Sequence, residues 1–295
     1  MTADAGAVAA ALAAALGRPV AASPQALHSG GPLHAVYRWP TAAGPVFVKL
    51  GAAADAPLLA AEAEGLGRLA AAGALRVPAV LGQGIAGASA WLALEWLVLA
   101  APTAASERAL GERLAAQHRI TGPRFGYPAD NFIGRTPQPN GWCDDCPGFV
   151  ATRRLAAQLA LAAPRGPAPL VERGARLIEL VGAFYAGYRP APSLLHGDLW
   201  GGNHGALGDG TPVVYDPAPY FGDREADLAM TRLFGGFGAA FYAAYDGSWP
   251  LDAGAGARLE LHNLYHVLNH WHLFGGGYGR AALAMIDRLL AAARG

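Results

Sequence analysis

The feature that most limits what this chain can fold into is the stretch 196–203, whose sequence is HGDLWGGN. It places a carboxylate, Asp198, ahead of an amide, Asn203, with four residues between them. Apolar residues precede the stretch, and a second apolar run at 212–215 leads into another acid, Asp216. The pattern predicts a short strand, a loop, a second strand and an acidic residue at the end of that strand.

The spacing of Asp198 and Asn203 is that of the protein-kinase catalytic loop. There the aspartate accepts the proton of the attacking hydroxyl and the asparagine holds a Mg²⁺ ion. Asp216 follows an apolar strand, as the second metal-binding aspartate of kinases does. Phosphoryl transfer needs such a set because its transition state spreads negative charge over the phosphate oxygens. A His-x-Asp triplet also occurs in simple turns, so the interpretation requires an upstream lysine and glutamate to complete the set.

The first third of the sequence supplies both residues. The run 46–50 alternates with a period of two, which puts Lys49 on one face of a strand and the aliphatic residues on the other. A lysine among apolar strand residues requires a carboxylate partner. Residues 58–72 predict a helix whose apolar stripe leaves Glu64 toward solvent, so Glu62 is the expected partner. The alternative is that both glutamates lie on an exposed surface.

Two other segments of this region are candidate nucleotide contacts. The glycine-rich turn Ser29-Gly30-Gly31 can close its backbone N–H groups over phosphates, although a plain tight turn is the alternative. Backbone groups near Glu95 and Leu97, at the end of a predicted strand, are expected to form the hinge that binds adenine. A linker between domains would fit the same residues.

The alternating and helical segments predict an α+β fold with two lobes, like that of protein kinases. Residues 1–97 form the expected nucleotide-binding lobe, a small antiparallel sheet with a helix. Residues 98–295 form the expected catalytic and substrate-binding lobe, which is mainly helical. Strands are expected at 25–28, 33–39, 46–50, 77–80 and 90–96, and helices at 5–16, 58–72, 106–119 (capped by Ser106) and 281–293.

Composition argues against several classes of protein. The sequence is 53% hydrophobic and 15% charged, which does not fit a disordered chain. Lys+Arg and Asp+Glu are 22 each, so no basic excess favours nucleic acid or an anionic membrane. The apolar run 5–16 lacks the basic start of a signal peptide, and the run 90–101 is too short to span a bilayer. We therefore expect a cytoplasmic protein with neither kind of partner, either a monomer or a homodimer.

Several longer segments resemble the fructosamine (ketosamine) kinase family, a branch of the aminoglycoside-phosphotransferase and protein-kinase-like superfamily. The likeness extends over nearly the whole chain, from Ser29 to about Tyr278. The two most specific segments are TPQPN at 136–140 and GDREADLAMTRLFGGF at 222–237. The other matching segments are 47–49, 62–66, 130–135, 196–203 and 216–218.

This resemblance implies ATP-dependent phosphorylation of a ketosamine, the adduct of a sugar with a free amine or a protein, at the sugar 3-hydroxyl. The product is labile and loses the sugar, which deglycates the amine. By the same resemblance Asp198 is the catalytic base, and Asn203 and Asp216 are the Mg²⁺ ligands. Lys49 and Glu62 form the pair that orients the phosphates of ATP.

The resemblance also implies weaker assignments. Asp130, Asn131 and Trp200 are candidate sugar contacts. Apart from the resemblance, Asp227 lies at a predicted helix start just past Asp216, where we expect it to fasten the catalytic loop by hydrogen bonds rather than to take part in the chemistry. The chain departs from the family pattern at Pro32, where a cysteine is common, and at Cys146, where a tryptophan is usual. The second departure puts the substrate preference in doubt if that aromatic residue lines the pocket.

Two other functions remain as alternatives. A different small-molecule kinase of the same fold, acting on an aminoglycoside, choline or another hydroxylated amine, would carry the same catalytic set, because fold does not fix substrate. A non-catalytic nucleotide-binding protein or scaffold would be expected to have lost part of that set.

Cysteines and histidines give weaker signals. Cys143 and Cys146 supply half of a tetrahedral zinc site, and no second pair follows. His262, His266 and His270 recur at intervals of four and share one helix face, where core or interface positions are expected rather than a metal site.

Overall fold

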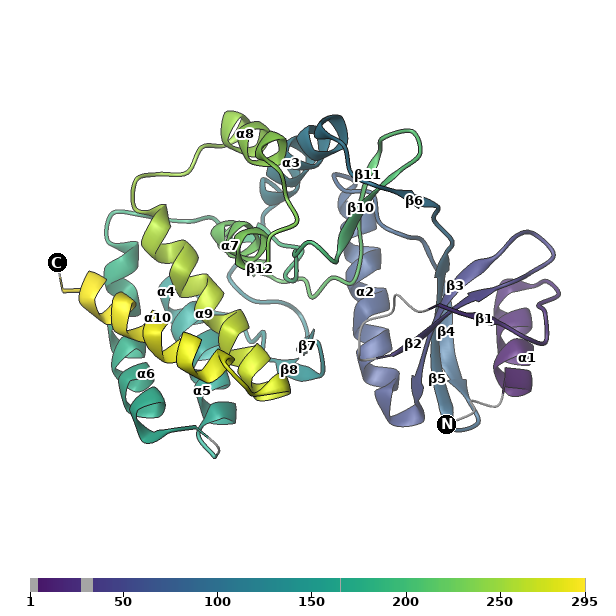
Figure 1. Ribbon diagram of the computed structural model, residues 1–295, viewed down its shortest axis with the longest axis horizontal. Helices are drawn as coiled ribbons and strands as arrows, with labels where there is room; N and C mark the ends of the chain where they lie inside the picture. Colours follow the sequence, from purple (N-terminus) through teal and green to yellow (C-terminus); the bar gives the residue numbers. More distant parts are fainter. Residues whose placement is uncertain (1–4, 28–33, 165, 295) are drawn as a thin grey trace. The chain divides into compact units, whose positions relative to one another are not determined.

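The computed structural model describes residues 5–27, 34–164 and 166–294. The chain forms two compact units (Figure 1). One consists of Met1–Ser106 and Gly205–Pro217, and the other of Glu107–His204 and Ala218–Gly295. Residues 205–217 therefore pack with the first unit, although they come late in the sequence.

The first unit is built on a five-stranded sheet with the order β1-β2-β3-β5-β4, in which all paired strands are antiparallel. Its strands are β1 (Gln25–Ala26), β2 (Ala35–Trp39), β3 (Val46–Ala52), β4 (Val80–Ala86) and β5 (Ser89–Glu95). Four of the five predicted strands are confirmed within the described residues, while His28 and Leu33, at the ends of two of these predictions, lie outside them. The prediction of a strand at 77–80 is wrong, since β4 begins at Val80. Pro78 has no N–H to give to a sheet ladder, which explains why the strand starts after it.

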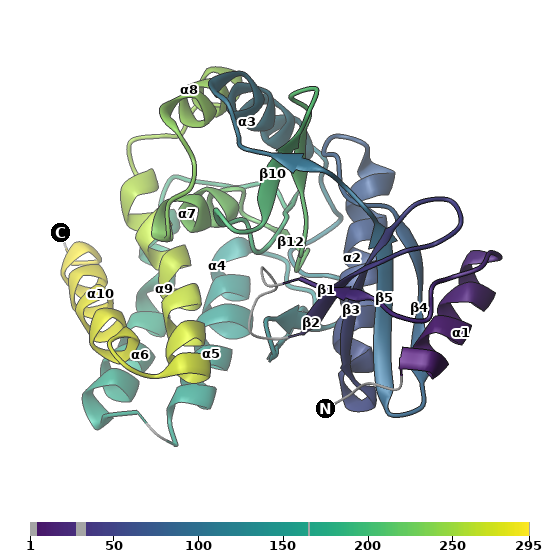
Figure 2. The ribbon, with the colours of Figure 1, turned by 45° about the vertical axis from the view of Figure 1, so that its right-hand side comes forward.

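Two helices cover opposite faces of this sheet (Figure 1 and Figure 2). Helix α1 (Ala5–Leu16), predicted in full, buries Val8 and Leu12 against Trp39 and Val48. Helix α2 (Ala56–Ala72) lies on the other face and ends at Gly73, whose φ of 74° suits a glycine. Because side chains alternate along β3, Val48 faces α1 while Lys49 faces α2.

A small second sheet holds the late segment in the first unit. Its strand order is β11-β10-β6, formed by β6 (Leu99–Ala100), β10 (His204–Leu207) and β11 (Pro212–Val214). The N–H of Val214 donates to the carbonyl of Arg76 at 3.0 Å, next to the start of β4. The chain thus delivers Asp216, two residues beyond β11, to the side of the sheet that carries Lys49.

The second unit is mainly helical. Helix α10 packs along α9 and α6 (Figure 2). The helices are α3 (Ala104–His118), α4 (Cys146–Phe149), α5 (Ala156–Ala162), α6 (Ala168–Leu180), α7 (Glu225–Leu233), α8 (Ala239–Ser248), α9 (Ala255–Phe274) and α10 (Tyr278–Ala292). A π-helical turn, Val150–Leu155, joins α4 to α5. Within the residues described, no helix combines the length and apolar character needed to cross a membrane.

Helix α3 begins two residues earlier than predicted, and its cap is Thr103 rather than Ser106. The Thr103 hydroxyl oxygen accepts from the N–H of Ser106 at 3.2 Å. In return the Ser106 hydroxyl accepts from the N–H of Thr103 at 2.8 Å. This reciprocal pair is a capping box in which Ser106 takes the place usually held by Glu or Gln. The prediction that Ser106 caps the helix was wrong by three positions.

Short strand pairs position the loops of the second unit. Strands β7 (Asn131–Ile133) and β8 (Thr136–Gln138) form a hairpin within the segment 125–142. Strands β9 (Ser193–Leu194) and β12 (Phe221–Gly222) pair on either side of the catalytic-loop sequence. The loop 196–203 thus leaves the end of β9.

Candidate active site

Lys49 lies between two carboxylates on the α2 side of the sheet. Its Nζ atom is 2.9 Å from Glu62 Oε2 and 2.5 Å from Asp216 Oδ1. The lysine side chain is only 9% exposed, which leaves its ammonium group few contacts with water. The predicted ion pair between Lys49 and Glu62 is therefore present, because β3 points the lysine at the second turn of α2. Lys49 is also the only lysine in the sequence.

The charges of this cluster depend on one another. Burial alone would lower the pKa of Lys49, but Asp216 and Glu62 outweigh it and raise that pKa well above its usual value. Burial raises the pKa of Glu62 to about 7 against the opposing effect of Lys49, and Asp216 adds to the rise. The ammonium thus stays charged at neutral pH.

Asp216 has an unusual backbone conformation. Its φ is 56°, a left-handed value that a residue with a side chain adopts at an energetic cost and that often marks functional sites. Its side chain is 44% exposed even though Oδ1 contacts Lys49. One carboxylate therefore both pairs with the buried lysine and faces solvent, which suits a ligand for a hard cation.

Asp198 and Asn203 contact each other in the second unit. The Nδ2 atom of Asn203 donates to the backbone carbonyl of Asp198 at 2.9 Å and to its Oδ2 at 3.2 Å. The amide nitrogen of Asn203 is thus directed at Asp198. The spacing of four intervening residues thus closes a compact loop, as the sequence pattern predicts.

Asp227, in the first turn of α7, holds the start of this loop. Its two carboxylate oxygens accept from the N–H groups of His196 at 2.7 Å and Gly197 at 2.8 Å. Burial alone would raise the pKa of Asp227, but the hydrogen bond from His118 and the other contacts lower it. The predicted fastening of the catalytic loop by Asp227 is confirmed.

Gly197 is needed at its position for two reasons. Its φ is 83°, and a Cβ atom built there would lie 2.0 Å from the carbonyl oxygen of Ala218. We expect Gly197→Ala to lower the free energy of unfolding by about 2–5 kcal/mol, combining left-handed strain with overpacking. Chemical denaturation of both proteins measures this difference.

The matched control is Gly182→Ala in the same unit, since a Cβ atom there meets nothing within 4 Å. We expect the control to change stability by less than about 1 kcal/mol. Equal stabilities for the two variants would contradict the strain assigned to Gly197.

The three candidate sugar contacts lie in different surroundings. Asn131 is 6% exposed, and its side chain is bonded to the carbonyl of Pro219 and to the side chains of Gln138 and Asn140. Asp130 accepts from the N–H of Asn140 at 2.7 Å. Trp200 is 39% exposed, beside Phe234. Trp200 and Asp130 are both exposed, whereas the buried Asn131 ties β7 to the neighbouring backbone.

Of the other residues predicted to contact the nucleotide, only Glu95 and Leu97 belong to the part of the chain that the structure describes. Ser29, Gly30 and Gly31 lie outside the described residues. The Glu95 carboxylate forms two 2.6 Å hydrogen bonds with Arg76, and the N–H of Glu95 donates to the carbonyl of Ala79. These bonds fix the end of β5, from which the chain runs on to Leu97.

The cysteines and the histidines of α9 have the following surroundings. Within the described ranges, no group of three or more His, Cys, Asp or Glu side chains is placed to hold a metal ion. Cys143 and Cys146 are free thiols, and Cys146 is buried. Among the histidines of α9, His262 and His266 are buried in the unit, so the expected core role is confirmed for these two.

Sequence reasoning missed a set of buried polar residues around the hairpin and the loop. The Tyr265 hydroxyl donates to Gln138 at 2.7 Å, and Arg154 donates to Asn140 at 2.8 Å. His118, at the end of α3, contacts Asp227 at 3.0 Å. For the contacts of Gln138 and Asn140, the only signal in the sequence was the family-specific segment 136–140. For His118, the only signal was its position as a polar residue on the apolar face of a predicted helix.

Comparisons with known proteins show which family the chain is similar to. The sequence profile of fructosamine kinases matches residues 5–292. A probable ketoamine kinase of Synechocystis is 45% identical over 248 residues, covering 83% of this chain and 82% of the relative. A chloroplastic protein-ribulosamine 3-kinase of Oryza sativa subsp. indica is 36% identical, covering 88% of this chain and 77% of the relative.

Solved structures give the same result. The crystal structure of a putative fructosamine-3-kinase from Thermobifida fusca has a TM-score of 0.85 at 34% identity, covering 97% of this chain and 99% of that one. An aminoglycoside phosphotransferase at 15% identity, with a TM-score of 0.65, shares the fold alone. The predicted α+β fold of the protein-kinase-like class is therefore confirmed. The chain belongs to the fructosamine kinase family.

Proposed function

We propose that this protein is an ATP-dependent kinase that phosphorylates the sugar 3-hydroxyl of ketosamines, the fructosamine or ribulosamine adducts of amines or proteins. The labile phosphorylated product then loses its sugar, and the amine is restored. The observation that carries the proposal is the cluster of Lys49 with Glu62 and Asp216, in a member of the fructosamine kinase family. The homologues named ketoamine and ribulosamine kinases support the substrate class.

The first unit supplies the nucleotide contacts in this proposal. Lys49 binds the phosphates of ATP, and Glu62 keeps its ammonium directed toward them. The backbone of Ser29, Gly30 and Gly31 closes over the phosphates, and the backbone near Glu95 and Leu97 binds adenine. Residues 1–97 then act as the nucleotide-binding lobe and residues 98–295 as the catalytic and substrate-binding lobe.

Asp216 and Asn203 are the residues proposed to hold Mg²⁺. The half-exposed carboxylate of Asp216 and the amide oxygen of Asn203 are hard oxygen ligands of the kind that Mg²⁺ accepts. When bound, the ion supplies positive charge that offsets the charge of the phosphates. Asp216 also keeps Lys49 in place. In this proposal one carboxylate therefore positions both the Mg²⁺ ion and the lysine ammonium against the phosphates of ATP.

Asp198 acts on the hydroxyl of the sugar. The sugar oxygen forms a bond to the γ-phosphorus while the bond to the β,γ-bridging oxygen breaks and ADP leaves, and the hydroxyl proton passes to the Asp198 carboxylate. The hydrogen bond from Asn203 to Oδ2 orients this carboxylate. Trp200, two residues further on, offers an exposed aromatic face to the sugar or amine, while Asp130 and Asn131 shape the neighbouring hairpin.

The setting of the protein is also part of the proposal. Two free thiols fit a reducing compartment, so we place the protein in the cytoplasm, as a monomer or homodimer.

A substrate panel tests the proposed function. Consumption of ATP is measured with ribulosamines, fructosamines, unmodified amino sugars, aminoglycosides and choline. We expect turnover with the ketosamines and none with the unmodified amines. Turnover confined to choline or an aminoglycoside would instead establish the alternative kinase function, which the homologues do not favour.

A further inference from the structure

The carboxylate of Asp227 is fully engaged in a buried site. It is 1% exposed and receives the N–H groups of His196 and Gly197. A third contact comes from His118 on α3, whose Nε2 lies 3.0 Å from Oδ2. A buried carboxylate needs such donors, since an unmatched charge in the protein interior is costly. The position of the catalytic loop therefore depends on what holds Asp227.

His118 is itself held from its other side. Its Nδ1 lies 2.8 Å from the hydroxyl of Tyr245 on α8, and His118 has no exposed surface. The Tyr245 oxygen also accepts from Arg224 at 3.2 Å, and arginine can only donate. An ionised carboxylate can only accept, so Nε2 of His118 carries the hydrogen given to Asp227. Burial raises the pKa of Tyr245 to about 12, so this hydroxyl keeps its proton.

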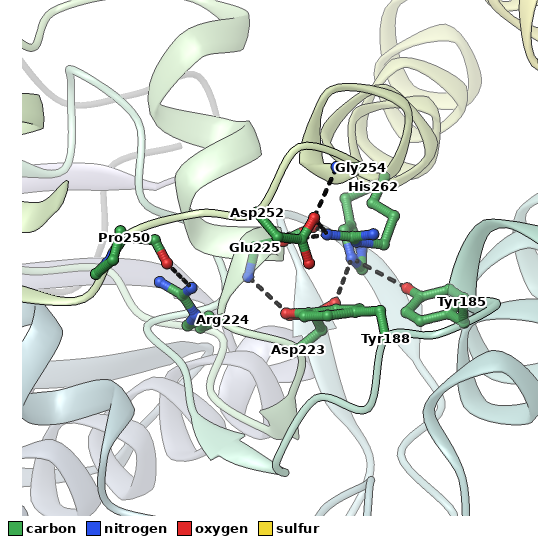
Figure 3. Close-up of polar contacts among 10 residues, drawn as sticks. Tyr185, Tyr188, Asp223, Arg224, Glu225, Pro250, Asp252, Gly254 and His262 are labelled. Carbon is green, nitrogen blue, oxygen red and sulfur yellow. Dashed lines mark hydrogen bonds and ion pairs between the residues drawn. The ribbon is translucent and has the colours of Figure 1, made fainter.

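Arg224 anchors the far end of the chain of bonds. It donates to the carbonyl of Trp249 at 2.8 Å. Figure 3 shows its second bond, to the carbonyl of Pro250 at 2.7 Å. Its guanidinium also lies over the Trp249 ring, 4.3 Å from the ring centre. The Arg224 guanidinium and the Asp227 carboxylate are therefore joined through the side chains of Tyr245 and His118.

We propose that His118 and Tyr245 are positioning residues for phosphoryl transfer, which hold Asp227 and, through it, the backbone that carries Asp198. The inference rests on the proposed function, but the contacts that carry it lie within the second unit. Because neither side chain touches the reacting atoms, both act only through the geometry of the loop. Loss of the His118 donor lets the Asp227 carboxylate turn away from the two backbone N–H groups.

A second buried histidine in the same unit provides an internal control. The Nε2 atom of His262 lies 3.3 Å from the Tyr185 hydroxyl and 3.5 Å from Asp223 Oδ2 (Figure 3). Asp223, however, accepts from Tyr188 and from the N–H of Glu225, not from the catalytic loop. Removal of either histidine therefore leaves a buried aspartate with one partner fewer, but only one of the two aspartates holds the loop.

The experiment compares His118→Leu with His262→Leu. We expect His118→Leu to lower kcat by ~10–100-fold, the usual effect of losing a partner that orients an active-site residue, with the KM for ATP unchanged. His262→Leu should lower Tm to a similar degree yet keep kcat within about 2-fold. His118→Gln, which retains a donor near Nε2, should recover most of the lost kcat. If His118→Leu does not fold, Tyr245→Phe serves instead, with an expected loss of about 3- to 10-fold.

Amide hydrogen exchange gives a readout that does not depend on turnover. Peptides covering 194–203 should exchange faster in His118→Leu and Tyr245→Phe than in the wild type, and at the wild-type rate in His262→Leu. Equal losses of kcat in the two histidine variants, or unchanged exchange in His118→Leu, would overturn the proposal. A wild-type protein without ketosamine turnover would reject the proposed function, whereas the exchange comparison would still decide the role of His118.

Discussion

Replacement of Asp198 by asparagine is expected to lower kcat by ~10²–10⁴-fold, the contribution of a positioned general base. Asparagine keeps an oxygen that can accept from Asn203 Nδ2, which contacts Asp198 Oδ2 at 3.2 Å in the wild type. The loop should therefore stay closed while the proton acceptor is lost. ATP consumption with a ketosamine gives kcat, and isothermal titration with a non-hydrolysable ATP analogue shows whether nucleotide binding is retained.

Asp209→Asn is the matched control for this substitution. Asp209 lies in the exposed turn between β10 and β11, where its carboxylate accepts from the N–H of Thr211. The same change of carboxylate to amide should leave kcat within about 2-fold there. Wild-type turnover in Asp198→Asn would reject the assignment of the base, and an equal loss in both variants would point to a general effect on folding.

Lys49→Met is expected to lower kcat/KM by ~10²–10³-fold, the loss typical of one preorganised electrostatic contact to developing charge. The change also leaves Glu62 and Asp216 facing each other without their shared cation, which lowers the free energy of unfolding. Because burial already raises the pKa of Glu62 to about 7, that carboxyl can take up a proton and limit the loss of stability. Steady-state kinetics and denaturation at pH 7 measure the two effects separately.

A double variant separates chemistry from stability at this site. Lys49→Met combined with Glu62→Gln removes one of the two carboxylates that the lysine pairs with. We expect stability to return toward the wild-type value and turnover to stay at the level of the single variant. Recovery of turnover together with stability would show that Lys49 acts only on folding.

The contact between Lys49 and Glu62 could be predicted because the direction of each side chain follows from the periodicity of its own strand or helix. A period of two on β3 and an apolar stripe on α2 each fix the direction of one side chain. The contact between Lys49 and Asp216 joins residues 167 positions apart, and no periodicity encodes it. The sequence singled out Asp216 only because Asp198, Asn203 and Asp216 match the spacing of a known catalytic set, and its ion pair with Lys49 was not predicted.

Other features could not be predicted because they depend on tertiary contacts. The segment 205–217 packs with the first unit through backbone contacts: β10 pairs with β6, and the N–H of Val214 donates to the carbonyl of Arg76. Such contacts do not depend on the side chains and therefore leave no pattern in the sequence. Thr103 and Ser106 are both acceptable caps by composition, and only the reciprocal bonds decide between them. His118 looked like an ordinary residue of an amphipathic helix, and its role depends on Tyr245 and Asp227, more than 100 positions away.

The central claim is that Lys49 lies beside the phosphates of bound ATP, and the sequence allows a direct test because it contains no other lysine. An acyl-phosphate derivative of ATP transfers its acyl group to a lysine amine held next to the nucleotide phosphates, and peptide mass spectrometry locates the modified residue. We predict that Lys49 is labelled and that excess MgATP suppresses the labelling. Labelling of the N-terminal amine alone, or labelling of Lys49 that MgATP leaves unchanged, would contradict the claim.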